Sequence, residues 1–190
     1  AVPVGVGAMA AILGLETQEV IDCCKMASDV GIVEPANFNC PGQIVVAGEV
    51  KAVEKAVELC KAKGAKRSML LPVSAPFHCS MLKPAGEKLA AELEKVQLND
   101  IGIPVISNVT ADYVKDKSQV KELLIKQVSS PVLWEDSIRK MLEDGVDTFV
   151  EIGPGKTLSG FVKKISKEAR ALNVEDIASL NKTLEELSNK

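Results

Sequence analysis

The chain has 190 residues and a formal net charge of -3, and 46% of its residues are hydrophobic but only 3% aromatic. This composition predicts one large or two small globular domains with an aliphatic core, which suits a sheet covered by helices. The mild acidity argues against a nucleic-acid partner, because neutralising phosphates needs clustered Lys and Arg. The densest basic run, residues 61–67, is expected to be a solvated helix end and turn.

No apolar run approaches the ~20 residues of a membrane span, and the first residues show no charged-then-apolar leader. We therefore expect a cytoplasmic protein without a membrane partner. Five cysteines without a C-x-x-C pair predict reduced, buried thiols. Cys23 and Cys24 are adjacent on a predicted helix and face different directions, so no metal site is expected. The chain begins at Ala1 and enters a glycine-bearing segment at once, which we interpret as an internal start.

The first 73 residues predict a small subdomain of their own. An apolar strand is expected at 7–15 and a helix at 17–30. Two extended runs, 32–39 and 43–48, flank a Pro-Gly turn and predict a hairpin. A helix at 50–63 and a strand at 66–73 follow. The order β-α-β-β-α-β predicts a ferredoxin-like subdomain over residues 1–73.

Helices and strands alternate over residues 74–190, which favours a parallel sheet and an α/β fold class. The expected strands are 104–109 and 148–152. The expected helices are 81–96, 120–128, 134–143, 157–169 and 174–188.

Two glycine motifs imitate nucleotide-binding loops. Residues 5–10 match G-x-G-x-x-A, but too few residues precede them for a strand, and a strand rather than a helix is expected to follow. Residues 155–157 (G-K-T) resemble the end of a P-loop, which would need glycine at Val150. We interpret the first as a flexible entry into a strand. The second, with Gly153, is expected to be a tight strand-to-helix turn whose amides could lie beside a ligand.

His78 is the only histidine and lies just past a predicted strand end. Imidazole moves protons near neutral pH, and active sites concentrate where strands end. The residues alone leave two interpretations: a structural histidine, or a base whose nucleophile comes from elsewhere, since Cys79 and Ser80 are too near along the backbone. The polar hairpin at 37–43 either binds a polar ligand or stabilises its turn.

Taken in order, these segments resemble the malonyl-CoA:acyl-carrier-protein transacylases of fatty-acid synthesis and the acyltransferase domains of polyketide synthases. The resemblance is most specific at residues 37–43, at His78 and at residues 153–156. It implies that residues 74–190 are the C-terminal part of an α/β-hydrolase-like core beside the ferredoxin-like subdomain.

The resemblance implies a cofactor-free, two-step transfer. A serine in a G-H-S-L-G elbow takes malonyl from malonyl-CoA, and the phosphopantetheine thiol of acyl carrier protein then accepts it. His78 matches the family's base, and Gln127 matches the residue whose backbone carbonyl orients that ring. Asn37 and Asn39 match polar residues of the cleft. Phe77, bulky and next to the histidine, implies selectivity for malonyl over methylmalonyl.

The serine elbow, the glutamine loop of the oxyanion hole and the arginine for the malonyl carboxylate all lie upstream of Ala1 in the family. We therefore expect this chain alone to be inactive. The absent segment is explained by proteolysis, by a separate chain that is then a partner, or by a shortened sequence. Two alternatives stay open: a non-catalytic domain that binds acyl carrier protein or CoA esters, and a fragment whose exposed apolar faces cause aggregation or require a partner.

Overall fold

The computed structural model describes residues 2–188, which form two compact units, one ending at Ser137 and one beginning at Ile138. The sequence-based boundary between residues 73 and 74 lies inside the first unit, because it was placed between the two expected subdomains. That boundary stays a prediction.

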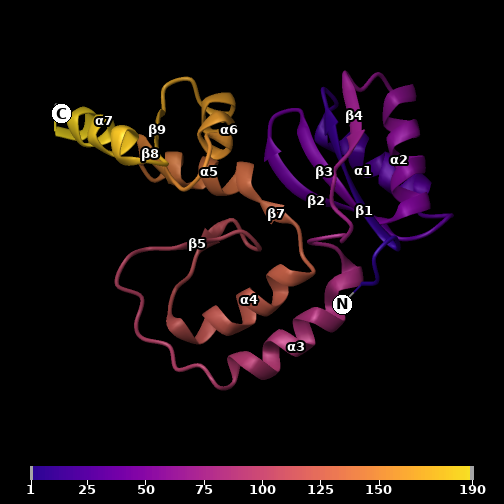
Figure 1. Cartoon of the computed structure of the whole chain (residues 1–190), viewed down its shortest axis with the longest axis horizontal. Helices are drawn as coiled ribbons and strands as arrows, with labels where there is room; N and C mark the ends of the chain where they lie inside the picture. Colours follow the sequence, from indigo (N-terminus) through magenta and orange to yellow (C-terminus); the bar gives the residue numbers. More distant parts are fainter. Residues whose placement is uncertain (1, 189–190) are drawn as a thin grey trace. The chain divides into compact units, whose positions relative to one another are not determined.

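The first unit is built on the expected ferredoxin-like order (Figure 1). Its strands and helices are β1 (Gly7–Leu13), α1 (Thr17–Ala27), β2 (Val33–Cys40), β3 (Gln43–Glu49), α2 (Val50–Ala62) and β4 (Arg67–Leu70). The strand order is β4-β1-β3-β2, and every pair among these four is antiparallel. The ferredoxin-like prediction is therefore confirmed.

The two faces of this sheet are buried against different partners. Alternate residues of a strand point to opposite faces. Ala10 and Ile12 of β1 pack against α1 and α2, whose apolar residues recur at helical spacing. Met9 and Ala11 belong to a second cluster, which includes Cys79 from the segment after β4. The sheet thus packs its helices on one face and the His78 segment on the other.

Strand β4 is shorter than the expected 66–73. Leu71 still donates its N–H to the carbonyl of Met9 at 2.8 Å, but Pro72 has no N–H to continue the ladder. The chain leaves the sheet there and crosses to the segment that carries His78.

The remainder of the first unit holds η1 (Ser80–Leu82), α3 (Lys83–Leu93), β5 (Ile106–Ser107), β6 (Asp112–Tyr113), η2 (Lys117–Gln119), α4 (Val120–Val128) and β7 (Val132–Leu133). The strand expected at 104–109 has only two residues, and it pairs antiparallel with β6, a strand that the sequence did not predict. Strand β7 joins the ferredoxin-like sheet parallel to β2, with Asn37 opposite Val132 and Phe38 opposite Leu133.

Helix α5 (Trp134–Glu143) leads into the second unit, with β8 (Thr148–Ile152), α6 (Thr157–Ile165), β9 (Arg170–Val174) and α7 (Ile177–Ser188). Strands β8 and β9 are parallel and joined by α6, which agrees with the expected parallel arrangement. The helix expected at 157–169 ends earlier, because the Ser166 hydroxyl accepts the N–H groups of Glu168 and Ala169 and turns the chain. Strand β9 was missed, and α7 begins three residues later than expected.

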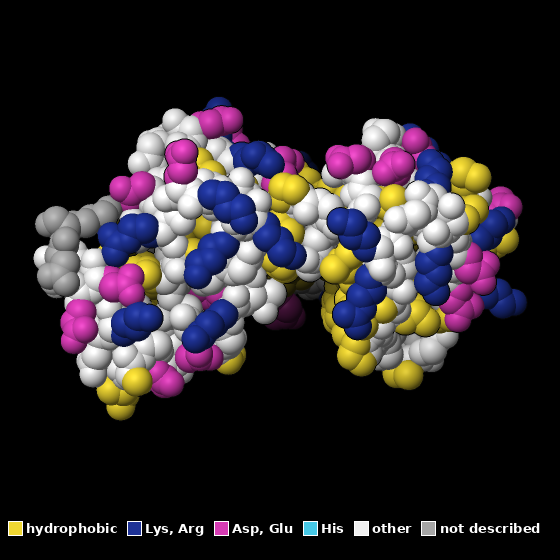
Figure 2. Space-filling model, turned by 90° about the horizontal axis from the view of Figure 1, so that it is seen from above, with side chains coloured by type: hydrophobic (Ala, Val, Ile, Leu, Met, Phe, Trp, Pro, Cys, Tyr) yellow, Lys and Arg dark blue, Asp and Glu magenta, His cyan; other side chains and the backbone are white. Residues whose placement is uncertain are grey.

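Figure 2 shows charged side chains of both signs on the face that it presents. Both units also expose large apolar side chains: Ile103 is 77% exposed in the first, and Ile152 and Ile177 are 82% and 78% exposed in the second. In the part of the chain that the structure describes, no helix combines the length and apolar character needed to cross a bilayer.

Gly48 of β3 provides a test of the sheet packing. A Cβ at this position would lie 2.0 Å from the carbonyl oxygen of Ile32 and 2.7 Å from Cα of Val33, so backbone would have to move. We expect Gly48→Ala to lower the free energy of unfolding by about 2 kcal/mol or more. Urea denaturation followed by circular dichroism measures this change. Gly102→Ala is the control, because a Cβ added at Gly102 would have nothing within 4 Å of it, and an equal effect of both substitutions would contradict the packing.

Candidate active site

The His78 segment is fixed against the sheet on both sides of the histidine. Pro76 is buried and packs on Gly7, where an added Cβ would lie 2.3 Å from the proline Cδ. Cys79 is only 1% exposed, and its thiol donates to the carbonyl oxygen of Pro76 at 3.1 Å. Both neighbours of the Phe77-His78 pair are therefore anchored in the first unit.

His78 itself adopts a left-handed backbone conformation, with φ of 60°. Residues with a Cβ pay about 1 to 2 kcal/mol for this conformation, although histidine is found there more often than most. Such strain persists only where the surrounding structure enforces it, and it concentrates at functional sites. The anchors at Pro76 and Cys79 contribute to that enforcement.

The imidazole of His78 contacts the C-terminal end of α4. Its Nδ1–H donates to the backbone carbonyl oxygen of Gln127 at 3.0 Å. A carbonyl oxygen can only accept, so this bond assigns the proton of a neutral ring to Nδ1 and leaves the lone pair on Nε2. The ring is thereby prepared to accept a proton at Nε2.

The side chain of Gln127 has a separate role. Its Nε2 lies 3.4 Å from Nδ1 of His78 and 3.1 Å from the carbonyl oxygen of Ser130. Because Nδ1 already carries a proton, it offers no lone pair, and the amide donates to Ser130 instead. This bond ties the end of α4 to the turn before β7, which helps to fix the carbonyl that His78 uses.

Glu34 of β2 is a further member of the site that the sequence did not indicate. Its carboxylate accepts hydrogen bonds from the backbone N–H of Ser80 at 2.7 Å and from the Ser80 hydroxyl at 2.8 Å. The two residues are 46 positions apart, so no local pattern could have paired them. Glu34 joins the sheet to the chain just after His78.

The structure does not bring all the predicted site residues into contact. His78 and Gln127 meet, whereas Asn37 lies opposite Val132 of β7 and Asn39 lies two positions further along β2. Within residues 2–188 no hydrogen bond joins either asparagine side chain to His78. Phe77 is next to His78 and 46% exposed. The binding roles of Asn37, Asn39 and Phe77 stay predictions, as do the catalytic roles of His78 and Gln127.

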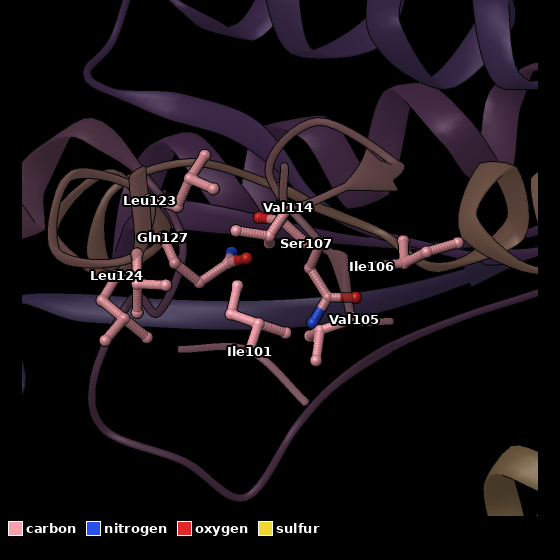
Figure 3. A pocket seen from close by; sticks show the side chains of 10 residues that line it. Ile101, Val105, Ile106, Ser107, Val114, Leu123, Leu124 and Gln127 are labelled. Carbon is pink, nitrogen blue, oxygen red and sulfur yellow. The ribbon is translucent and has the colours of Figure 1, made fainter. Parts of the chain in front are cut away.

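An apolar cavity of about 310 Å³ lies beside α4 (Figure 3). Its wall is formed mainly by Ile101, Val105, Ile106, Val114, Leu123 and Leu124, and the Gln127 side chain reaches toward its middle. Among its lining residues, Gln127 is the only predicted site residue. The cavity therefore borders the site through Gln127 but is not the predicted substrate cleft.

The two glycine motifs lie at the beginning of one strand and at the end of another. Gly7 is the first residue of β1, so a strand rather than a helix follows the first motif, as expected. In the second motif Gly153 donates its N–H to the carbonyl oxygen of Val174 and Gly155 donates to the carboxylate of Glu175 at 2.9 Å. Those two amides are occupied by the protein itself. Among residues 2–188 no cluster of three His, Cys, Asp or Glu side chains is arranged to hold a metal ion.

The sequence and the fold of this chain both match those of known acyltransferases. The model of the acyl transferase domain matches residues 3–188. The chain belongs to the acyl transferase domain family. The malonyl CoA-acyl carrier protein transacylase of Bacillus subtilis is 47% identical over 193 residues, which cover 100% of this chain and 60% of the relative. The enzyme of the same name from Haemophilus influenzae is 45% identical and matches 95% of this chain and 58% of its own length.

Solved structures of the family share the fold of this chain. A malonyl CoA-acyl carrier protein transacylase from Clostridium perfringens superposes with a TM-score of 0.96 at 52% identity, over 99% of this chain and 59% of that one. A malonyl-transacylase in complex with a type II polyketide synthase acyl-carrier protein gives 0.95 at 42% identity, over 97% of this chain and 60% of that one. The fold is therefore that of these acyltransferases, a ferredoxin-like subdomain with part of an α/β-hydrolase-like core. The chain spans about 60% of the length of the relatives it matches.

Two buried cysteines of the first unit, Cys79 in the His78 segment and Cys24 in α1, are expected to react slowly at neutral pH. Burial raises the pKa of Cys79 to about 11 and that of Cys24 to about 12, because the thiolate would lose its hydration. At pH 8 we expect the Cys79 thiol to react with an aromatic disulfide about a hundredfold more slowly in the folded chain than in urea. The unfolded thiols ionise near pH 9, whereas the folded ones stay protonated there. The free energy of unfolding therefore falls as the pH rises above 9.

Absorbance of the released thiol follows the rate, and peptide mass identifies the modified residue. Rapid modification of Cys79 in the folded chain would contradict its assignment as a buried anchor.

Proposed function

We propose that this chain supplies the base-bearing part of a malonyl-CoA:acyl-carrier-protein transacylase of fatty-acid synthesis. The observation that carries the proposal is the hydrogen bond from His78 Nδ1 to the Gln127 carbonyl, which leaves Nε2 free to accept a proton. The family membership and the names of the relatives support malonyl-CoA as donor and acyl carrier protein as acceptor. The cytoplasm, where we expect malonyl-CoA to be available, is the proposed location.

The proposed reaction has two proton transfers through Nε2 of His78. In the first half, Nε2 takes the proton of a serine hydroxyl as its oxygen attacks the malonyl thioester carbonyl. The carbon–sulfur bond then breaks, and CoA leaves with that proton. In the second half, the phosphopantetheine thiol gives its proton to Nε2 and attacks the malonyl ester, and the serine oxygen leaves and is reprotonated.

A carbonyl partner suits this chemistry. A carboxylate opposite Nδ1 stabilises the imidazolium by its charge, whereas a carbonyl fixes the tautomer and orientation with a dipole alone. In the first half the leaving group is the CoA thiolate, and thiolates leave readily because their pKa is low, about 8.5 for cysteine, so this step demands less help from an imidazolium than amide cleavage does. In the second half the imidazolium returns its proton to the departing serine oxygen. The Gln127 carbonyl meets the requirement for orientation without adding a negative charge to the site.

The nucleophile is the part of the mechanism that this chain does not supply. The sequence contains no G-x-S-x-G motif. We infer that the serine belongs to the part of the family fold that the match leaves uncovered, whether that part lies on the same polypeptide or on a partner chain. The exposed Ile103, Ile152 and Ile177 support this inference, because a further segment would remove these side chains from water.

Complementation tests the proposal. Intact-protein mass spectrometry is used after mixing malonyl-CoA with this chain alone, with a polypeptide that carries the family's G-H-S-L-G elbow, and with both together. We expect a malonyl adduct on the elbow polypeptide only in the mixture of both. His78→Gln should slow its formation by about 10²- to 10⁴-fold, since the general base is lost.

Ser74→Ala is the matched control for His78→Gln, because Ser74 is exposed in the same segment. An adduct on this chain alone would mean that it carries a nucleophile of its own. With no adduct in any mixture, the transacylase proposal falls, and binding of acyl carrier protein or a CoA ester without catalysis becomes the function to measure.

Phe77 provides a separate test of substrate choice. We expect Phe77→Ser in the complemented enzyme to raise the ratio of methylmalonyl to malonyl transfer about tenfold, because a smaller side chain beside the histidine leaves room for one methyl group. The ratio is measured with both CoA esters in competition. An unchanged ratio would show that Phe77 does not select the acyl group.

A further inference from the structure

Strand β2 contacts both segments that form the His78–Gln127 pair. At its beginning, Glu34 holds the backbone N–H and hydroxyl of Ser80, two positions after His78. Toward its end, Asn37 and Phe38 pair with Val132 and Leu133 of β7, which follows Gln127 by five positions. The same strand, β2, therefore holds both the donor side and the acceptor side of the hydrogen bond.

The two attachments differ in kind. The β7 attachment is a backbone ladder of only two residues, reinforced by the N–H of Leu133 donating to the Asn108 carbonyl at 2.9 Å. The Glu34 attachment is a pair of charge-assisted hydrogen bonds, which are stronger than neutral ones. Ser80 also begins η1, so its N–H has no partner within the helix, and the carboxylate satisfies it.

We infer that Glu34 is a positioning residue for the transacylase reaction, which holds His78 in its left-handed conformation so that Nδ1 meets the Gln127 carbonyl. Three observations agree. The φ of 60° at His78 needs an external restraint. Cys79 and Pro76 restrain the segment from the sheet side, and Ser80 is the next point of attachment along the chain. Glu34 is the partner of Ser80 through both of its oxygens.

This inference rests on the proposed function for its meaning, but its test does not require acyl transfer. The chain has one histidine, so the ring nitrogen signals of ¹⁵N-histidine-labelled protein come from His78 alone. At alkaline pH, where imidazole rings are neutral, these signals report which nitrogen carries the proton. The intact labelled chain is measured as it is, without the elbow polypeptide.

The unsubstituted chain should show the Nδ1–H tautomer. In Glu34→Ala, Ser80 is released and the bond to the Gln127 carbonyl weakens, so the ratio of the Nε2–H to the Nδ1–H tautomer should rise about fivefold or more. Glu34→Gln should give a smaller rise, because its amide can accept from the Ser80 N–H and donate to the Ser80 hydroxyl through neutral bonds. Ser80→Ala, which loses the hydroxyl bond and keeps the N–H bond, should also be intermediate.

Glu49→Ala is the matched control. The Glu49 carboxylate also accepts from a backbone N–H, that of Ile32 just before β2, at 3.2 Å, but it holds no residue of the His78 segment. Its removal should leave the tautomer unchanged. Backbone amide spectra of each variant establish that the sheet is folded, and Glu34→Gln keeps the test valid if Glu34→Ala does not fold.

An unchanged tautomer ratio in folded Glu34→Ala would overturn the inference. If Glu34→Ala does not fold, an unchanged ratio in both Glu34→Gln and Ser80→Ala would overturn it. An equal change in Glu49→Ala would do so too, because the effect would then be one of general loosening. The outcomes for the two proposals are separable. A tautomer that responds to Glu34 while no malonyl adduct forms would retain the positioning role and reject the transacylase, and the reverse result would reject the positioning role alone.

Discussion

The site depends on one hydrogen bond between segments 49 residues apart, from the Nδ1–H of His78 to the carbonyl oxygen of Gln127. A neutral imidazole has one proton and one lone pair, and this bond determines which nitrogen has which. The first unit holds both bonded groups in place. The sheet anchors Pro76 and Cys79 on one side, and the turn after α4 holds the carbonyl on the other.

The ferredoxin-like sheet makes that support possible because both of its faces are used. A half-exposed antiparallel sheet would leave Met9 and Ala11 in water, and here they pack with Cys79 instead. The face that carries α1 and α2 supplies the larger core, with Val20, Val53 and Cys60 almost fully buried. The core on this face stabilises the sheet, and the opposite face of the sheet packs against Cys79, the neighbour of the strained His78.

The surface of the chain is consistent with a larger assembly. The chain covers 60% of the length of its Bacillus subtilis relative, so a substantial part of the family fold has no counterpart in it. Ile152 at the end of β8 and Ile177 at the start of α7 are exposed in a unit whose sheet, within the described residues, has only two strands. Two parallel strands seldom stand alone, because parallel sheets are normally covered on both faces. The proposed base at His78 and the two-stranded sheet of the second unit both fit our proposal that the uncovered part of the family fold completes the site.

The sequence by itself determined what is set by local periodicity and turn chemistry. The apolar run of β1, the helical spacing of Val20, Cys23 and Ala27 and the Pro-Gly turn between β2 and β3 were sufficient for the ferredoxin-like order. His78 was recognisable as a chemical candidate, and Gln127 was identified through the family resemblance rather than through any spacing. Only the tertiary structure decided the tautomer of His78, its backbone strain, the Glu34–Ser80 contact, the β5–β6 pair and strand β9. The tautomer and the Glu34–Ser80 contact depend on groups 49 and 46 positions apart, where a linear pattern carries no information, and the strain at His78 depends on what its segment packs against. Strands β5 and β6 have only two residues each, too few for a periodic pattern, and β9 follows a redirection of the backbone at the Ser166 side chain.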